Sequence, residues 1–292
     1  MVGLLLVNRI QSVLNFDGWE SPQFKSSAGV GRIGVAGFGL GIIVGVHVCL
    51  LAVNPWIWRS WPLAQWGLYV TCIAVFHFTE FFTTAMFKPT VVSYDSFVIN
   101  HSTAYTMAVI ASAAEFWVEF LVFGHRKFQP VVFVLGLGLI AIGQFFRSAA
   151  MWTARESFNH LIVEHLAPEH RLITHGVYRI FRHPSYFGWF WWCVGTQVLL
   201  CNPIVALLYA GAAWNFFQTR VPYEEATLLR LFGEEYKLYA QRTPVAIPFV
   251  KPLVPVQRRG SAQRVEKPRG PEGAAEPRRA PDSDQGSSNK TD

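Results

Sequence analysis

The sequence predicts an all-α integral membrane protein with about six transmembrane helices, and three observations support this prediction. Of its 292 residues, 51% are hydrophobic and only 15% are charged, whereas soluble domains carry about 25% charged residues. The mean hydropathy is positive, at +0.26. Aromatic residues make up 15% of the chain, with 11 Trp among them, and such residues gather where lipid meets water.

Six apolar stretches are candidates for the membrane spans. A helix that crosses a bilayer needs about 20 mostly apolar residues, and the candidates are residues 33–53, 64–87, 97–123, 131–152, 186–201 and 203–219. The last two are short, and Asn202–Pro203 separates them. Proline is tolerated at the start of a helix, so a tight helical hairpin is expected there. The apolar stretch Leu4–Val7 is too short for a signal peptide and is expected to be interfacial.

The basic residues are distributed unevenly between the two ends of these spans. Six spans place both termini on one side, which carries all 13 Lys and Arg from Arg220 onward and eight others, namely Arg9, Lys25, Arg32, Lys88, Arg155, Arg171, Arg179 and Arg182. The opposite loops hold only Arg59, Arg126 and Lys127. Loops rich in Lys and Arg stay in the cytoplasm, so the termini and the 153–185 loop are expected there. Because the net charge of +6 lies in loops and tails of an apolar chain, no nucleic-acid partner is predicted.

The chain is expected to have four regions. A cytoplasmic or interfacial segment (1–32) precedes four transmembrane helices (33–152). Residues 153–252 hold a cytoplasmic loop, the helical hairpin at 186–219 and C-terminal helices. The tail at 253–292 is rich in Pro, Gly, Ser, Arg and Glu and is expected to be disordered. All four cysteines lie in apolar segments without a C-x-x-C pair, so buried thiols are expected rather than disulfides or zinc ligands.

Small residues repeat every four positions in the first span, at Gly37, Gly41 and Gly45. The stretch "GFGLG" there is similar to a nucleotide-binding loop, but no strand precedes it. Close packing against another helix is therefore the expected role of these glycines.

Ionisable and polar residues also lie inside the predicted spans, namely His77, Glu80, Glu115, Glu119, Gln144 and Arg147. A charge within a bilayer costs a few kcal/mol and normally faces the helix bundle or a wet cavity. Pairing between helices is the main expectation. Two alternatives stay open, a metal site built from His77, Glu80 and the other glutamates, and contact of Gln144 or Arg147 with a ligand.

The loop before the hairpin is the first candidate site. It holds five of the nine histidines, but their spacings of 5, 5, 5 and 8 match no usual zinc pattern. Gly176 allows a turn, and Pro184 allows a helix to begin beside it. The free N–H groups of the first turn, the His183 imidazole and the Tyr186 hydroxyl would then surround a polar pocket at the membrane surface. The N-terminus of a helix favours the binding of anionic groups such as carboxylates and phosphates.

A second polar cluster follows the last span. Arg220 and Glu224 are four positions apart, so a helix places them on one face. An arginine can hold a carboxylate through two hydrogen bonds, and a glutamate can accept from an amine or from hydroxyls. The alternative is a surface ion pair of little energetic value.

The stretches "HGVYRIFRHPSYFGWFWWCVGTQVLLCNP" and "EEATLLRLFGEEYKLYAQRTPVAIPF", with "GQFFRSAAM" and "FNH" before them, resemble the isoprenylcysteine carboxyl methyltransferases. "FHFTEFFTTA" and "DSFVINHSTAYT" also look like earlier spans of that family, so the similarity covers roughly residues 70–250. The motif set is highly specific when taken together. "RHPSYFG" alone is less so, because similar turns occur in phospholipid methyltransferases and membrane sterol reductases.

The resemblance implies an endoplasmic-reticulum membrane enzyme of the six-span form with a cytoplasmic cofactor pocket formed by its C-terminal half. Such an enzyme methylates the α-carboxylate of a C-terminal farnesyl- or geranylgeranyl-cysteine with S-adenosyl-L-methionine. Its partners would be prenylated CaaX-protein C-termini, including Ras- and Rho-type GTPases and prenylated peptides, together with membrane lipid. The prenyl chain would enter from the bilayer.

The resemblance also implies roles for individual residues. Arg220 would hold the substrate carboxylate. Cofactor contacts would come from Val163, His170, Arg171, Leu172, Ile173, Tyr178, His183, Pro184, Ser185, Tyr186 and Glu224. Family members often have a polar residue where this chain has Val163, so only a backbone contact is expected there. No metal ligand is implied.

The chemistry agrees with a site that lacks a general base. A carboxylate with an ordinary pKa of about 3.5 is already ionised at pH 7 and can attack a methyl sulfonium directly. Three alternatives remain, namely a phospholipid N-methyltransferase, an NADPH-dependent membrane sterol reductase and a non-catalytic lipid-binding protein.

Overall fold

The computed structural model describes residues 20–53, 60–99, 102–162, 164–165 and 171–257, and these contain helices and no strand. The helices are α2 (Pro22–Lys25), α3 (Val30–Val53), α5 (Trp61–Phe87), α6 (Thr103–Phe123), α7 (Pro130–Ala154), α8 (Pro184–Leu199) and α9 (Pro203–Ala240). Short 3-10 turns join them, namely η2 (Pro89–Val91), η3 (Tyr94–Phe97), η4 (Gly124–Lys127), η5 (Arg155–Ser157) and η6 (Gly176–Arg179). Leu4–Val7 and most of the predicted tail lie outside the described residues.

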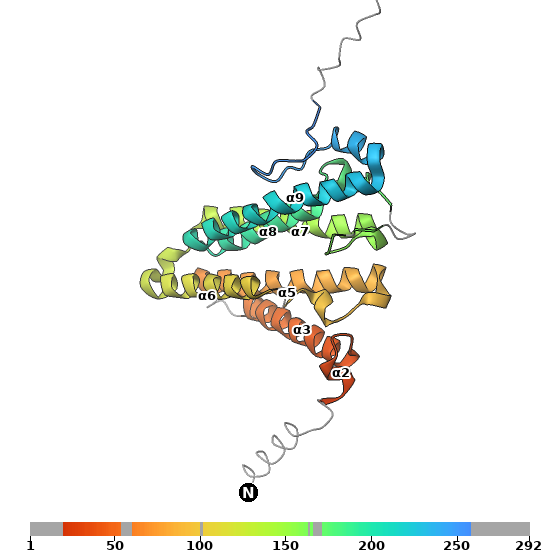
Figure 1. Cartoon of the computed structure of the whole chain (residues 1–292). Coiled ribbons are helices and arrows are strands. Elements are labelled where there is room, and N and C mark those ends of the chain that lie inside the picture. The colour runs from red at the N-terminus through yellow and green to blue at the C-terminus, as the bar shows by residue number, and fades with distance from the viewer. Residues whose placement is uncertain (1–19, 54–59, 100–101, 163, 166–170, 258–292) are drawn as a thin grey trace, which may run out of the picture. The chain divides into compact units, whose positions relative to one another are not determined.

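The described helices form two layers within one compact unit that ends at Val256. Figure 1 shows α7, α8 and α9 side by side in one layer, with α5 and α6 in the other and α3 against α5. The main apolar core draws on both layers and includes Phe76, Phe116, Ile140, Trp192 and Phe217. The segments that follow α5 and α7 lie at the same end of the layers (Figure 1).

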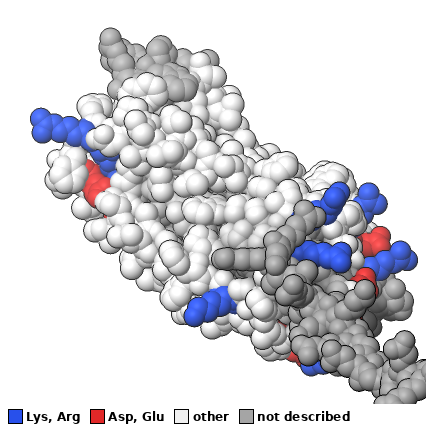
Figure 2. Space-filling view, turned by 90° about the horizontal axis from the view of Figure 1, so that it is seen from above, with Lys and Arg blue, Asp and Glu red and all other residues white. Residues whose placement is uncertain are grey.

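Four helices of the described chain are long and apolar enough to cross a membrane, at Val30–Ala52, Trp61–Phe87, Thr103–Lys127 and Pro130–Ser157. They match the first four predicted spans. Large apolar side chains such as Leu121, Val131 and Leu207 are exposed on the surface, which suits contact with lipid. Figure 2 shows a broad uncharged surface, with Lys, Arg, Asp and Glu gathered mainly towards its ends.

Two predicted boundaries differ from the structure. The third span was expected from residue 97, but α6 begins at Thr103, because η3 buries Phe97 completely and Ser102 caps the new helix. The last span was expected to end at residue 219, but α9, which has 38 residues in all, ends at Ala240. Pro222 lies inside α9, and Gly233, with φ of 53°, marks a kink between two helical parts of α9. Residues 220–232 after the last predicted span therefore continue the same helix, and residues 234–240 follow the kink.

Glycines allow close packing of α7 against α8. A Cβ atom added at Gly136, Gly143 or Gly188 would lie 2.3 to 2.5 Å from a backbone nitrogen of the opposite helix. No side chain fits there, so the two backbones are in direct contact. Small residues of this kind let helices approach closely in membranes.

The expectation of close packing at the α3 glycines is wrong. A Cβ atom at Gly41 or Gly45 would meet nothing within 4 Å among the described residues, and one at Gly37 would meet only the Phe97 ring, at 3.9 Å. The same four-residue spacing is thus compatible with an open helix face, because spacing alone does not say what lies opposite.

Near the α8–α9 turn, charged side chains form ion pairs and hydrogen bonds with neighbouring segments, as expected for glutamates inside spans. Lys127 is 5% exposed, and its Nζ lies 2.5 Å from Glu119 Oε2 and 3.0 Å from Asn202 Oδ1. Glu115 accepts hydrogen bonds from the backbone N–H groups of Ile204 and Val205, at 2.8 and 2.7 Å. These contacts tie the first turn of α9 to α6 and η4.

Candidate active site

A cavity of about 1240 Å³ is lined by α5 to α9 and by the segments that follow α5 and α7. Ten of the twelve site positions predicted from the sequence line it, namely Arg171, Leu172, Ile173, Tyr178, His183, Pro184, Ser185, Tyr186, Arg220 and Glu224. The other two, Val163 and His170, lie outside the described residues. The structure therefore brings together segments more than 50 positions apart, while the roles of the residues stay predictions.

The hydroxyl of Tyr186 joins the two candidate motifs. Helix α8 begins at Pro184 with His183 as its N-cap, which places Tyr186 in the first turn. The Tyr186 hydroxyl donates to Glu224 Oε2 at 2.5 Å and accepts from Arg220 Nε at 3.0 Å. Arg220 and Glu224 share one face of α9, as their spacing predicts, and this hydroxyl lies between them. Arg220 Nη2 also donates to the backbone oxygen of His160, at 2.8 Å.

The His183 imidazole is held between two carboxylates. It is 5% exposed and stacks on the Tyr186 ring, with centroids 5.4 Å apart. Its Nδ1 lies 3.7 Å from Glu224 Oε1, and its Nε2 lies 3.5 Å from Glu225 Oε1. His183 therefore faces both the cavity and a buried ion pair behind it.

That ion pair connects the site to the C-terminal segment. Arg182 Nη1 lies 2.8 Å from Glu225 Oε1, and both side chains are fully buried. Glu225 Oε2 accepts from the backbone N–H groups of Leu253 and Val254, at 2.7 and 3.2 Å. Burial favours a higher pKa for Glu225, but the neighbouring His183 and Arg182 outweigh it, so the pKa of Glu225 lies below its ordinary value.

Replacing Glu225 by glutamine should lower the free energy of unfolding by about 3 kcal/mol, because it leaves the buried Arg182 without a counter-ion. A carboxylate whose pKa is lowered in the folded state stabilises the protein above its ordinary pKa of 4.5 and loses this effect as the pH falls through the lowered value. The difference between the two proteins should therefore shrink below about pH 4.5. Thermal unfolding in detergent as a function of pH measures both effects, and equal midpoints at pH 7 would contradict the assignment.

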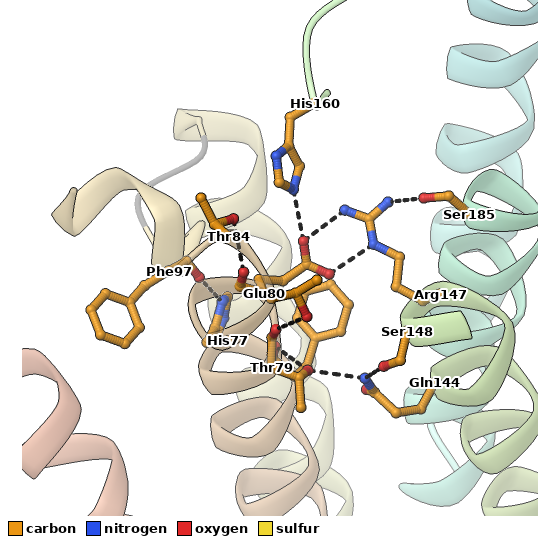
Figure 3. A network of polar contacts seen from close by, with 12 residues as sticks. His77, Thr79, Glu80, Thr84, Phe97, Gln144, Arg147, Ser148, His160 and Ser185 are labelled. Carbon is orange, nitrogen blue, oxygen red and sulfur yellow. Dashed lines mark hydrogen bonds and ion pairs between the residues drawn. The ribbon is translucent and has the colours of Figure 1, made fainter. Parts of the chain in front are cut away.

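A second polar network adjoins the same cavity (Figure 3). Glu80 of α5 accepts two hydrogen bonds from Arg147 of α7, at 2.7 Å from Nε and 2.8 Å from Nη2. Arg147 Nη1 donates to Ser185 Oγ at 2.5 Å, and His160 Nε2 lies 2.8 Å from Glu80 Oε2. Gln144 donates to Thr79 and Ser148, on α5 and α7. These contacts connect α5, α7, α8 and the loop after α7.

Arg147 and His160 are cavity residues whose roles the sequence left open. In the sequence, Arg147 is a charged side chain near the end of an apolar span, and such a side chain normally faces a partner or a wet cavity. In the structure, Arg147 contacts its partner Glu80 and also lines the cavity. Among the described residues, no group of three or more His, Cys, Asp or Glu side chains is placed to hold a metal ion. The structure pairs Glu80 with an arginine instead.

The cavity changes character along α8. Its wall includes the polar residues His183, Ser185 and Tyr186 at the start of the helix, and mainly apolar ones further along, where Trp189, Trp192 and Cys193 precede Thr196. Phe76 of α5 and Phe217 of α9 add to the apolar part. With a rise of about 1.5 Å per residue, this part of α8 extends roughly 15 Å from the polar end. A ligand with one charged and one apolar end fits such a wall.

Known proteins resemble this chain in sequence and in structure. Residues 134–230 match the isoprenylcysteine carboxyl methyltransferase family. Protein-S-isoprenylcysteine O-methyltransferases are 40% identical in Xenopus laevis (over 73% of this chain and 70% of the relative) and 43% identical in Homo sapiens (over 66% and 67%). The Saccharomyces cerevisiae enzyme of that name is 34% identical, over 80% of this chain and 97% of its own.

A solved structure of a eukaryotic intramembrane Ras methyltransferase agrees with this chain at a TM-score of 0.72 and 35% identity, over 86% of this chain and 88% of the other. The matches over 67% to 97% of these relatives, and the helical fold shared with an intramembrane enzyme, go beyond a shared motif. This chain is therefore a membrane methyltransferase that belongs to the isoprenylcysteine carboxyl methyltransferase family.

Proposed function

We propose that this enzyme uses S-adenosylmethionine to methylate the C-terminal α-carboxylate of farnesyl- or geranylgeranyl-cysteine in processed CaaX proteins, including Ras- and Rho-type GTPases. The main support is a single cavity that is polar around Tyr186 and apolar further along α8. A water-soluble donor and a lipid-borne acceptor can meet in such a space. Its volume of about 1240 Å³ exceeds the roughly 300–1,000 Å³ of a typical single-ligand pocket, which leaves room for both.

The residues present fit S-adenosylmethionine. Glu224 offers a carboxylate to an ammonium or to ribose hydroxyls, and the N-terminus of α8 favours a carboxylate. Tyr236 lines the cavity, and its hydroxyl is buried with no hydrogen-bond partner among the described residues. A buried hydroxyl of this kind normally has a partner, which a bound ligand would supply. The cofactor provides a methyl group on a positively charged sulfur.

Arg220 is the residue that we assign to the substrate carboxylate. Within the described chain, its hydrogen bonds to Tyr186 and His160 use two of the five N–H groups of a guanidinium. The remaining donors can orient one carboxylate oxygen and leave the other free to attack. No base is needed, so the work of the site is alignment and exclusion of water. Alignment of two reactants can contribute about 7–11 kcal/mol, and desolvation of the attacking oxygen adds to it.

We further propose six spans, with the α8–α9 hairpin as the last two and both termini and the cavity mouth on the cytoplasmic side of the endoplasmic reticulum. The bias of Lys and Arg supports this orientation. Helix α8 has only 16 residues, fewer than the about 20 of a full span, so a hairpin of modest depth is the form that we expect. A prenyl chain stays in lipid, and the enzyme must therefore meet its terminal carboxylate at the interface.

One assay separates the candidate functions. The purified enzyme should transfer label from S-adenosylmethionine to N-acetyl-S-farnesylcysteine as a base-labile methyl ester. A phospholipid N-methyltransferase would instead label phosphatidylethanolamine, and a sterol reductase would require NADPH. A non-catalytic lipid-binding protein would not bind S-adenosylmethionine. Absence of the ester with an enzyme that binds the cofactor would contradict the proposal.

Replacing Glu224 by alanine should raise the Kd for S-adenosylmethionine about tenfold or more, because a hydrogen bond to a charged group contributes about 1.5–3 kcal/mol. Glu234→Ala is the matched control, since Glu234 is an exposed glutamate just beyond the Gly233 kink of α9 and pairs only with Lys237 among the described residues. Calorimetry in detergent measures both. A Glu224→Ala enzyme that binds cofactor as tightly as the control would remove this residue from the cofactor site.

A further inference from the structure

The cavity is lined by Arg147, Arg155, Arg171, Arg182 and Arg220. Two of them, Arg147 and Arg220, are linked through Glu80 and His160, and their partners differ in charge. Arg147 has its charge matched by the Glu80 carboxylate, through two hydrogen bonds. The described partners of Arg220 are a hydroxyl and a backbone oxygen, both uncharged. Of these two guanidinium groups, only that of Arg147 is compensated by a carboxylate in direct contact among the described residues.

Glu80 contacts Arg147 and His160 (Figure 3), and through His160 it is linked to Arg220. It is fully buried, and its Oε2 lies 2.8 Å from His160 Nε2. The backbone oxygen of His160 in turn accepts from Arg220 Nη2, at 2.8 Å. The Glu80 carboxylate thus contacts the Arg147 guanidinium directly and is linked to the Arg220 guanidinium through His160.

The reacting groups lose their charges during the proposed reaction, so the cations beside the substrate carboxylate affect the rate of the chemical step. In the proposed reaction the carboxylate oxygen forms a bond to the methyl carbon, and the carbon–sulfur bond breaks with its electron pair going to sulfur. The negative charge on oxygen and the positive charge on sulfur both disappear. Cations beside the carboxylate therefore stabilise the ground state more than the transition state, which slows the chemical step.

We propose that Glu80 is a positioning residue and an internal counter-ion. It neutralises Arg147 and orients Arg220 through His160, so that the substrate carboxylate meets the positive charge of Arg220 without that of Arg147. This inference rests on the proposed function, since it needs a carboxylate as the nucleophile. It assigns a role to a buried charge whose burial alone would be costly.

The test compares Glu80→Gln with Glu115→Gln, the same substitution at another intramembrane glutamate, which caps α9. With N-acetyl-S-farnesylcysteine as substrate, Glu80→Gln should lower kcat about tenfold and also lower KM severalfold, because Arg147 is no longer compensated. Adding Arg147→Gln to Glu80→Gln should return KM to the wild-type value or above it. Glu115→Gln should lower thermal stability and leave KM unchanged.

A purely structural role predicts a lower kcat with KM unchanged or raised, and that result overturns the inference. If Glu80→Gln does not fold, Glu80→Asp keeps the charge and shortens the side chain. It should then lower kcat with KM within about twofold of wild type, and a KM that falls severalfold in this variant also overturns the inference. The proposed function is judged separately, by whether the wild-type enzyme forms the ester at all.

Discussion

Alanine at Arg220 is expected to lower kcat/KM for N-acetyl-S-farnesylcysteine by about a hundredfold or more. Truncating one partner of a desolvated charge pair costs about 2–5 kcal/mol, and here the proposed partner is the reacting carboxylate itself. Both KM and kcat should change, since the oxygen is neither bound nor aligned. The Kd for S-adenosylmethionine should stay within about threefold, because Glu224 still holds the Tyr186 hydroxyl.

Two control variants sharpen this experiment. Arg230→Ala removes an exposed arginine from the same helix, whose described hydrogen bond is to the Glu164 backbone, and it should leave kcat/KM unchanged. Arg220→Lys keeps the charge but loses the two-pronged geometry of the guanidinium, so it should recover only part of the activity. Wild-type kinetics in the Arg220→Ala enzyme would exclude this residue as the carboxylate ligand.

Alanine at Gly188 is expected to remove most of the activity although it adds only one methyl group. That methyl carbon would lie 2.4 Å from the Arg147 backbone nitrogen and 2.6 Å from the Gly143 oxygen. Both are backbone atoms, so α7 and α8 must separate. Such overpacking typically costs about 1–3 kcal/mol of stability, and a displacement of about 1 Å at a catalytic site can cost a hundredfold in rate.

Gly138→Ala is the matched control on α7. A methyl group there meets nothing within 4 Å, so the variant should keep wild-type activity and a thermal midpoint at least as high. Methyl transfer and thermal unfolding in detergent measure the two effects separately. Full activity in the Gly188→Ala enzyme would show that the spacing of α7 and α8 does not set the geometry of the site.

Local features of the site follow from neighbouring residues. Pro184 lacks the N–H group that a helix interior needs, so it predicts the start of α8, and Asn202–Pro203 predicts the start of α9 for the same reason. The spacing of Arg220 and Glu224 predicts that they share a helix face. The end of α9 was not predictable in this way, because Pro222 and the polar residues after it are typical of a helix end.

Contacts between distant segments needed the folded chain. Lys127 belongs to a loop by its position in the sequence, yet it is buried against Glu119 and Asn202. A Cβ atom at Gly37, Gly41 or Gly45 of α3 would meet no other backbone within 4 Å among the described residues, whereas one at Gly188 or Gly195 of α8 would meet the backbone of α7. Hydropathy and spacing describe one helix at a time, so they do not say which face meets which neighbour.

The sequence by itself determined that this is a helical membrane protein, which motifs it carries and which residue types surround the proposed chemistry. These properties depend on composition and on residues a few positions apart. Only the tertiary structure decided that Glu80 pairs with Arg147 and that Tyr186 lies between Arg220 and Glu224. Those partners are 34 to 67 positions apart, and the packing register of whole helices determines whether they meet.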